Sequence, residues 1–271
     1  MIITHLNDMN SKKLIDCLTD FEGAKGLNKD EKEKSLEYPF TKIAQKMLRG
    51  GYFLISGCDN EKYRIYIHSI EFYYHEELSD NKNMNETTRV CDWVMYHRNP
   101  LTGKKKEAYL TGTLHPHDSG IDITFEDQKN DPDQIRYRAS ALIRSFKVTK
   151  GDNEDFELFE SFPPHISNPD KAVEYYPTHL KYYFFKQFPL KRISIEWIDK
   201  NEKITDLYKG IRINVFESTW DIKDNGQIYN LHKKTTKDNK PIRDNRKWAF
   251  CKDPIKLTFN KECFPFEKVV L

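Results

Sequence analysis

One long segment, Tyr63 to Tyr74, constrains the fold of this chain more than any other. It is rich in isoleucine, tyrosine and phenylalanine, the residue types that are typical of β-strands. The segment therefore predicts a long strand and a fold that is built on a sheet. Shorter strands are predicted at residues 52–55, 120–125, 141–148, 193–198 and 211–216.

Two helices are predicted before this strand. Leu14, Ile15 and Leu18 recur at helical spacing, and Ser11 is placed to cap them. Apolar residues from 40 to 48 recur at i, i+3, i+4, i+7 and i+8, and two glycines end the pattern. The mixed-charge run between the two patterns, residues 29–37, is interpreted as a solvated segment.

The chain shows no internal repeat and no Pro/Gly/Ser-rich linker, which favours one α+β domain with a predominantly antiparallel sheet. Its 271 residues are 13% aromatic, and each large ring buries much apolar surface, so a sizeable core is expected. We predict a helical extension over residues 1–37, the α+β domain over 38–252, and a tail over 253–271 that packs on the domain.

Several classes of protein are not favoured. No apolar run reaches the length of a membrane span, and residues 1–10 lack the pattern of a signal peptide. The five cysteines show no CxxC spacing and are interpreted as reduced core residues, so we expect a cytoplasmic protein without membrane contact. The net charge of +2 excludes a strongly polybasic arm or an acidic tail protein. No Gly-rich phosphate loop and no GxSxG motif is present.

Glu71 and Tyr73 are the first candidates for chemistry. Strand periodicity places both on one face of the long strand, while Ile70, Phe72 and Tyr74 point to the core. A carboxylate among aromatic side chains is suited to general-base chemistry when its pocket is dry. An ordinary exposed glutamate at a strand end is the alternative interpretation.

Four further polar residues draw attention. Arg144 lies inside an apolar strand pattern, which indicates a buried partner or a pocket lining, since an unpaired buried arginine is costly. His97 is flanked by Tyr96 and Arg98, where a surface histidine is the simpler interpretation. His115 and His117 could point the same way from an extended segment and bind a metal, although Pro116 argues against regular strand pairing there.

Taken in order, these segments resemble the alkyladenine (3-methyladenine) DNA glycosylase family. The family pattern begins with a helix and a Leu-Leu-Gly-Lys-x-Leu strand, followed by a strand that ends in Glu-x-Tyr, to which Glu71 and Tyr73 are similar. A histidine then follows, best matched by His97. The remaining similar segments are Gly112–Gly120, Leu142–Arg144, Ile211–Val215 and Arg246–Phe250, so that the resemblance spans residues 38–252.

The resemblance implies a curved, mainly antiparallel sheet flanked by helices, and hydrolysis of an N-glycosidic bond that releases a modified purine from nucleic acid. Glu71 would activate water and Arg144 would help to position it, while Tyr73, His97, His117 and Asp122 would contact the flipped base. No metal and no organic cofactor is implied. The expected partner is DNA, bound weakly or only at lesions in base excision repair, and the expected state is a monomer.

The segment that carries a duplex-inserting tyrosine in that family offers only His117, Asp118 and Ser119 here. The charge of +2 is also low for a duplex binder, so the lysines at 104–106 or the stretch 232–247 would have to supply phosphate contacts. Two alternatives stay open: a non-catalytic binder of nucleobases or nucleic acid with the same fold, and a metal-dependent enzyme that uses His97, His115, His117 and Asp122.

Overall fold

The fold was analysed in a computed structural model of the chain. It describes residues 12–56, 62–77, 88–92, 95, 107–117, 120–150, 158–159, 194–200, 206–212, 215–222, 228–252, 257–259, 262–264 and 266–269. These residues form one α+β domain with an open, antiparallel sheet and two α-helices.

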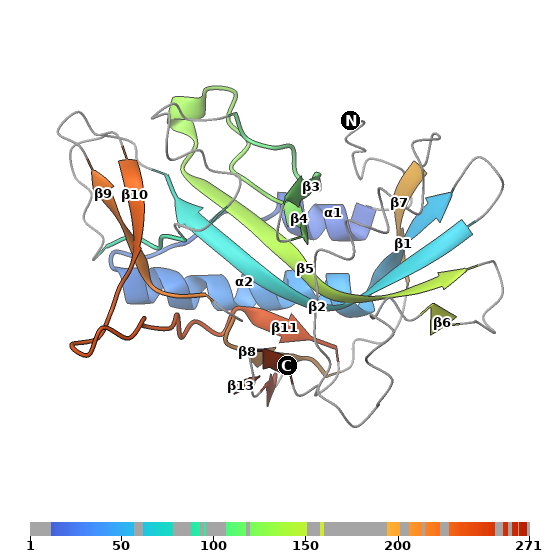
Figure 1. Ribbon diagram of the computed structural model, residues 1–271. Coiled ribbons are helices and arrows are strands. Elements are labelled where there is room, and N and C mark those ends of the chain that lie inside the picture. The colour runs from blue at the N-terminus through green and yellow to red at the C-terminus, as the bar shows by residue number, and fades with distance from the viewer. Residues whose placement is uncertain are drawn as a thin grey trace.

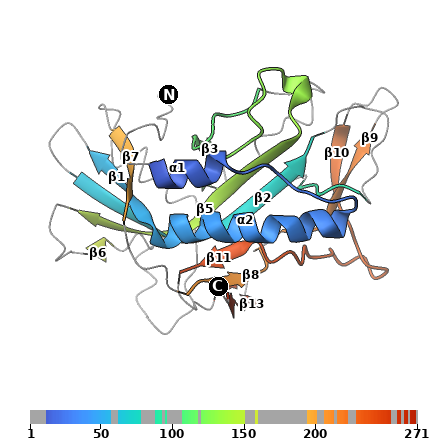
Figure 2. The same cartoon turned by 180° about the vertical axis from the view of Figure 1, so that it is seen from behind.

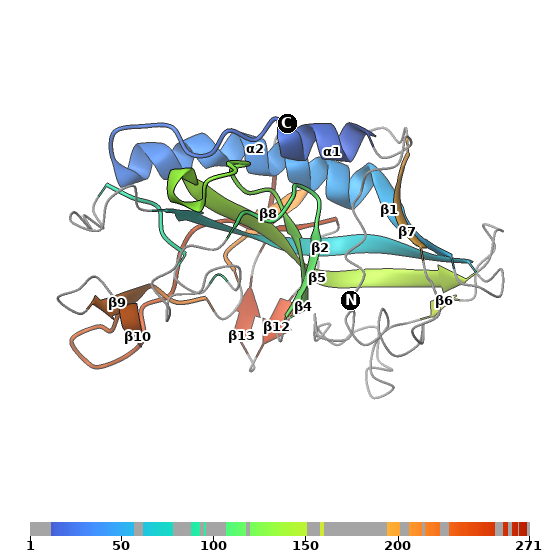
Figure 3. The same cartoon turned by 90° about the horizontal axis from the view of Figure 1, so that it is seen from above.

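The two helices, α1 (Lys12–Thr19) and α2 (Lys29–Arg49), lie together on one face of the sheet (Figures 2 and 3). The N-terminus of α2 is capped by Asn28, whose side chain accepts a hydrogen bond from the amide of Glu31 at 2.9 Å. Neither helix has the length and apolar character needed to cross a membrane.

The charged run 29–37 is the first part of α2, and most of its charged side chains are exposed, as expected of a solvated segment. Its Leu36 is fully buried, and the helix runs on through Pro39, where a backbone donor is missing. A proline inside a helix is unfavourable by itself, so the buried face of α2 outweighs that local preference. The helix is continuous across residue 37, where the sequence suggested a boundary between extension and domain.

Among the described residues the main sheet has ten strands, seven of which follow one another in the order β14-β8-β11-β2-β5-β4-β3, while β1, β6 and β7 pair off this path. The long strands β2 (Lys62–Glu76) and β5 (Tyr137–Lys150) pair antiparallel along almost their whole length and form its centre (Figure 1). Strand β1 (Gly51–Ser56) pairs with β2 and with β7 (Ser194–Asp199). The other members are β3 (Leu114–His117), β4 (Gly120–Thr124), β6 (Leu158–Phe159), β8 (Tyr208–Gly210), β11 (Ala249–Cys251) and β14 (Glu267–Lys268).

Two hairpins lie outside this sheet, β9 (Ser218–Ile222) with β10 (Ile228–Lys233), and β12 (Leu257–Phe259) with β13 (Glu262–Phe264). A short 3₁₀ helix, η1 (Pro132–Gln134), precedes β5. Of the strand expected at 211–216, residues 213–214 lie outside the described residues; 211, 212 and 215 belong to no strand, and Phe216 makes only an isolated bridge with Arg243. The stretch 232–247 is more ordered than the loop that its polar composition suggested, since β10 extends into it.

Pro116 does lie in a strand, contrary to expectation, opposite Ile121 of β4. Strand β3 is the last strand of the sheet order, and an edge strand can place a residue without an amide hydrogen on its outer side. The β3–β4 hairpin places His117 beside β4, opposite Gly120.

The core lies between the helices and the sheet. Phe40 of α2 stacks on Phe72 of β2 with ring centroids 4.3 Å apart, and the edge of Trp248 meets the Phe40 ring at 5.2 Å. Ile70, Phe72 and Tyr74 are all buried on this side, as the alternation predicted. The odd-numbered residues of this part of β2, Glu71 and Tyr73 among them, therefore project from the opposite face of the sheet.

Candidate functional site

Glu71 occupies the middle of the sheet and not a frayed strand end. It pairs in register with Leu142 of β5 on one side and with Ala249 of β11 on the other. Its residue surface is 1% exposed, so the interpretation of an ordinary exposed glutamate is wrong. A carboxylate in this position needs partners, because burial of an isolated charge is unfavourable.

Two side chains supply those partners. The hydroxyl of Tyr73 donates to Oε2 of Glu71 at 3.1 Å, and Nε of Arg144 lies 3.2 Å from Oε1. Burial raises the pKa of the Tyr73 phenol well above its ordinary value, and the negative charge of Glu71 raises it further. Tyr73 therefore stays protonated and acts as a hydrogen-bond donor. We call Glu71, Tyr73 and Arg144 the Glu71 cluster.

A second polar pair, Asp122 of β4 and His117 of β3, lies on the same face of the sheet. Asp122 is directly opposite Leu142, which is itself opposite Glu71, so the two acids belong to one cross-strand row. Nε2 of His117 lies 3.3 Å from Oδ2 of Asp122, and the hydroxyl of Ser140 donates to the same oxygen at 3.4 Å. The fold thus brings Glu71, Tyr73, Arg144, Asp122 and His117 to one face of the sheet.

The described residues do not support the interpretation of a metal site at His115 and His117. The rings of His115 and His117 are 6.1 Å apart, and His115 packs against Tyr109 at 4.6 Å. Within the described part of the chain, no three His, Cys, Asp or Glu side chains come together as metal ligands. His97, the remaining predicted site residue, lies outside the described residues, as do Asp118, Ser119 and the lysines at 104–106.

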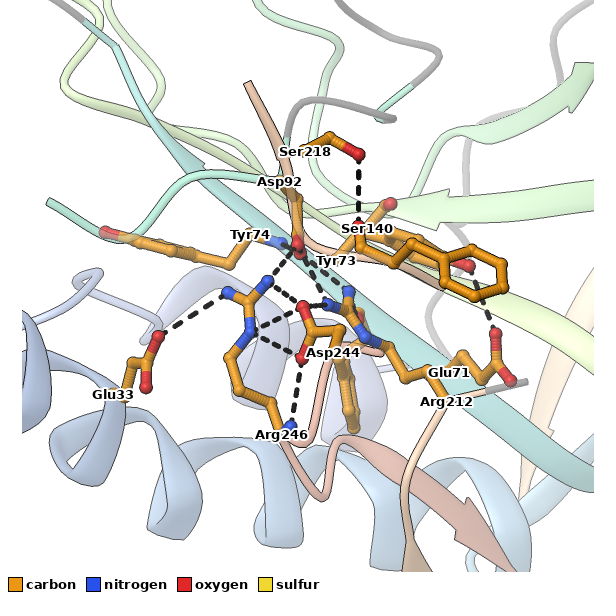
Figure 4. A network of polar contacts seen from close by, with 12 residues as sticks. Glu33, Glu71, Tyr73, Tyr74, Asp92, Ser140, Arg212, Ser218, Asp244 and Arg246 are labelled. Atoms are coloured by element: carbon orange, nitrogen blue, oxygen red, sulfur yellow. Dashed lines mark hydrogen bonds and ion pairs between the residues drawn. The ribbon is translucent and has the colours of Figure 1, made fainter. Parts of the chain in front are cut away.

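A buried charge network that was not predicted from the sequence lies next to Tyr73 and is made of Asp92, Arg212, Asp244 and Arg246 (Figure 4). We call it the Arg212 network. The guanidinium of Arg212 is fully buried, donates to both oxygens of Asp92 at 2.7 and 2.9 Å, and reaches Asp244 at 2.7 Å. Arg246 bonds to the same two carboxylates.

The charges of the Arg212 network stabilise one another. Burial would lower the pKa of Arg212, but Asp92 and then Asp244 raise it above its ordinary value. Burial would raise the pKa of Asp244, but Arg212 and Arg246 hold it well below its ordinary range. Arg212 and Asp244 are therefore charged at neutral pH, and Glu33 of α2 lies 3.8 Å from Arg246 at the edge of the network.

The Arg212 network and the Glu71 cluster meet at the ring of Tyr73. The guanidinium carbon of Arg212 lies 4.9 Å from the Tyr73 centroid and 5.1 Å from that of Trp248. The signal for Arg212 was available in the sequence, a single arginine within the apolar run 211–215, the same signal that singled out Arg144. Neither pattern shows which residue pairs with the arginine, because that partner comes from another part of the chain.

A cavity of about 600 Å³ adjoins the Arg212 network and not the Glu71 cluster. Its wall includes Glu33 of α2, Asp92, Asp244, Arg246 and Trp248, whereas Glu71 and Tyr73 do not line it. No protein family model, curated protein or solved structure matches the chain. The functional interpretation therefore rests on the residues and their geometry.

Proposed function

We propose that this protein hydrolyses an N-glycosidic bond and releases a modified purine base from nucleic acid, with Glu71 as the base that activates water. The observation that carries the proposal is the buried Glu71 carboxylate, held at 3.1 Å by Tyr73 and at 3.2 Å by Arg144 in the middle of the sheet. A fixed carboxylate in a site from which water is largely excluded is what a general base requires. We also propose that the helices and the sheet are arranged as in that glycosylase family, and that the polymer is DNA.

In the proposed reaction, Glu71 takes one proton from a water molecule whose oxygen attacks C1′ of the sugar. The new bond joins that oxygen to C1′, and the bond that breaks joins C1′ to the purine nitrogen. The bonding electrons leave with the base, which takes up a proton from solvent or from a nearby donor. The negative charge of Glu71 also stabilises the positive charge that develops on the sugar.

Arg144 and Tyr73 set the direction of the Glu71 carboxylate. Arg144 occupies Oε1 and Tyr73 occupies Oε2, so the remaining lone pairs of Glu71 have defined directions. His117 and Asp122 lie on the same face of the sheet as Tyr73. We assign base contacts to Tyr73, His117 and Asp122, and extend them to His97 by the family resemblance.

The test is a base-release assay on oligonucleotides, single- and double-stranded, that carry alkylated or deaminated purines. Glu71→Gln keeps the size and the hydrogen-bonding shape of the side chain but removes the base, so release should fall by about 10²- to 10⁴-fold. Glu22→Gln, an exposed acid paired with Lys25, is the matched control and should retain wild-type activity. Full activity of the Glu71→Gln variant would exclude Glu71 as the base.

A second candidate, a protein that binds a nucleobase or a modified strand without cleavage, is favoured by one observation. Both oxygens of Glu71 already hold a partner, as in a site that recognises and does not react. The same oligonucleotides separate the two functions, because the binder retains a shifted or fluorescent complex while no free base or abasic site appears.

A further inference from the structure

The stretch after β10 forms a compact, basic projection. Strand β10 pairs with β9, then Thr235 bridges Pro241, and Phe216 bridges Arg243. Between these bridges, the amide of Thr236 donates to the carbonyl of Lys240 at 2.8 Å, and Asn239 adopts a left-handed turn conformation with φ of 58°. We call residues 233–243 the basic finger.

The basic finger gathers several lysines on one short folded element. Lys233, Lys237 and Lys240 are exposed, and no carboxylate of the described residues forms an ion pair with them. Exposed lysines elsewhere, such as Lys34 and Lys129, also lack an ion pair with the described residues, but several lysines lie on carboxylates, for example Lys32 on Glu76 at 2.9 Å. Others are Lys25, Lys29, Lys209, Lys247 and Lys268.

The finger is also organised at its base. Nζ of Lys233 lies 4.3 Å from the centroid of the Phe216 ring, and the guanidinium of Arg243 lies 5.6 Å from it. These contacts, with the two bridges, fix the direction in which the finger leaves the domain. Its cations are thus presented on a folded element.

The position of the finger relates it to the Glu71 cluster. Figure 3 shows the β9–β10 hairpin on the side of the sheet opposite to the helices, which is the side to which Glu71 and Tyr73 project. A polymer that approached the Glu71 cluster would come from the same side as the finger. The charge of the whole protein is only +2, so phosphate contacts are expected from a local group of exposed cations.

We propose that the basic finger binds the phosphate backbone of nucleic acid, with Lys233, Lys237 and Lys240 as the phosphate contacts. The proposal deepens the proposed function and rests on it for the identity of the polymer. The contacts are independent of sequence, because a lysine ammonium on a phosphate fixes position and carries no information about the base. The loss of affinity on removing the finger lysines should therefore be the same for strands of different base sequence.

The test measures the affinity of the full chain for a fluorescent 20-base-pair duplex and for its single strand, from low to moderate salt. The triple variant K233A/K237A/K240A should bind both more weakly. The slope of log affinity against log salt should become shallower by about 2 to 3, since each phosphate contact contributes about 0.9 on a duplex and 0.7 on a single strand. The matched control is K25A/K34A/K42A, which changes the net charge equally at exposed positions on or before α2.

The proposal is supported if only the finger variant loses affinity and slope. It is overturned if the finger and control variants behave alike, or if the finger variant loses binding to anionic phosphatidylserine vesicles but not to oligonucleotides. Far-UV circular dichroism of each variant shows whether it is folded. The catalytic proposal is tested separately, because Glu71→Gln should bind like wild type, and a finger-dependent complex without base release would reject only the glycosylase activity.

Discussion

The Glu71 cluster and the Arg212 network are both buried groups of charges on β2 and its neighbours, yet they are built differently. In the Arg212 network, two carboxylates face two guanidiniums, and Asp92 also accepts from the amide of Tyr74 at 2.8 Å. In the Glu71 cluster, one carboxylate faces one guanidinium and one phenol, and the Arg144 side chain keeps 14% of its exposure. The first arrangement surrounds each charge with opposite charges, whereas the second holds a single carboxylate between one cation and one neutral donor.

The difference predicts that the two groups contribute differently to stability. A network of four charges that loses one member leaves an unbalanced charge in the interior, so its members are expected to carry stability. A carboxylate with one cationic and one neutral partner leaves fewer charges unbalanced when it is neutralised, and the proposed function assigns it to the reaction. Variants in the two regions should therefore separate stability from activity.

The largest effect is expected for Arg212→Met, which removes the centre of the network and leaves Asp92 and Asp244 with Arg246 alone. The free energy of unfolding should fall by about 3 to 5 kcal/mol. Urea unfolding followed by circular dichroism measures it. Glu22→Gln on the surface should change stability by less than about 1 kcal/mol, and a similarly small change in Arg212→Met would remove the distinction between the two regions.

Asp244→Asn tests the network through pH. The pKa of Asp244 is lower in the folded than in the unfolded protein, so its contribution is complete above about pH 4 and is lost as the pH falls toward the folded value. The variant should be less stable than wild type by about 2 to 3 kcal/mol at pH 7, with a gap that narrows below pH 4. Urea midpoints at pH 7, 5, 4 and 3 measure this, and a gap that stays constant would contradict it.

Glu71→Gln should cost only about 1 kcal/mol of stability, because the amide oxygen can still accept from Arg144 while the amide NH2 donates to the Tyr73 hydroxyl. The matched variant Glu126→Gln removes the charge opposite the buried Arg138, whose side chain is 1% exposed, and should cost more. Thermal unfolding of the pair gives the comparison. A larger loss for Glu71→Gln than for Glu126→Gln would mark Glu71 as structural.

Tyr73→Phe gives the smallest stability effect and separates the two regions at the residue they share. The ring stays against Arg212, while the donor to Oε2 of Glu71 is lost. Stability should change by less than about 1 kcal/mol. Base release should fall by about tenfold, equivalent to about 1.4 kcal/mol of activation free energy. An unchanged rate in the oligonucleotide assay would remove Tyr73 from the reaction.

Much of the local structure could be predicted from sequence, because strand and helix periodicity are local properties. The alternation along β2 correctly separated Glu71 and Tyr73 from the core residues, and the isolated charge at 144 correctly indicated a buried partner. Where the structure differed, context overrode the local pattern. Pro116 entered a strand because β3 is an edge, and the charged run 29–37 is helical as well as solvated because Asn28 caps it and Leu36 is buried.

The sequence by itself determined which side chains of β2 face the core and which face the site, since neighbouring residues in a strand point to opposite sides. Only the tertiary structure decided which charges meet. Arg212 lies 120 residues from Asp92 and 32 from Asp244, and Glu71 and Asp122 share a row only through the register of β2, β5 and β4. Such contacts depend on how the strands close into one sheet, and no local pattern of residues encodes that closure.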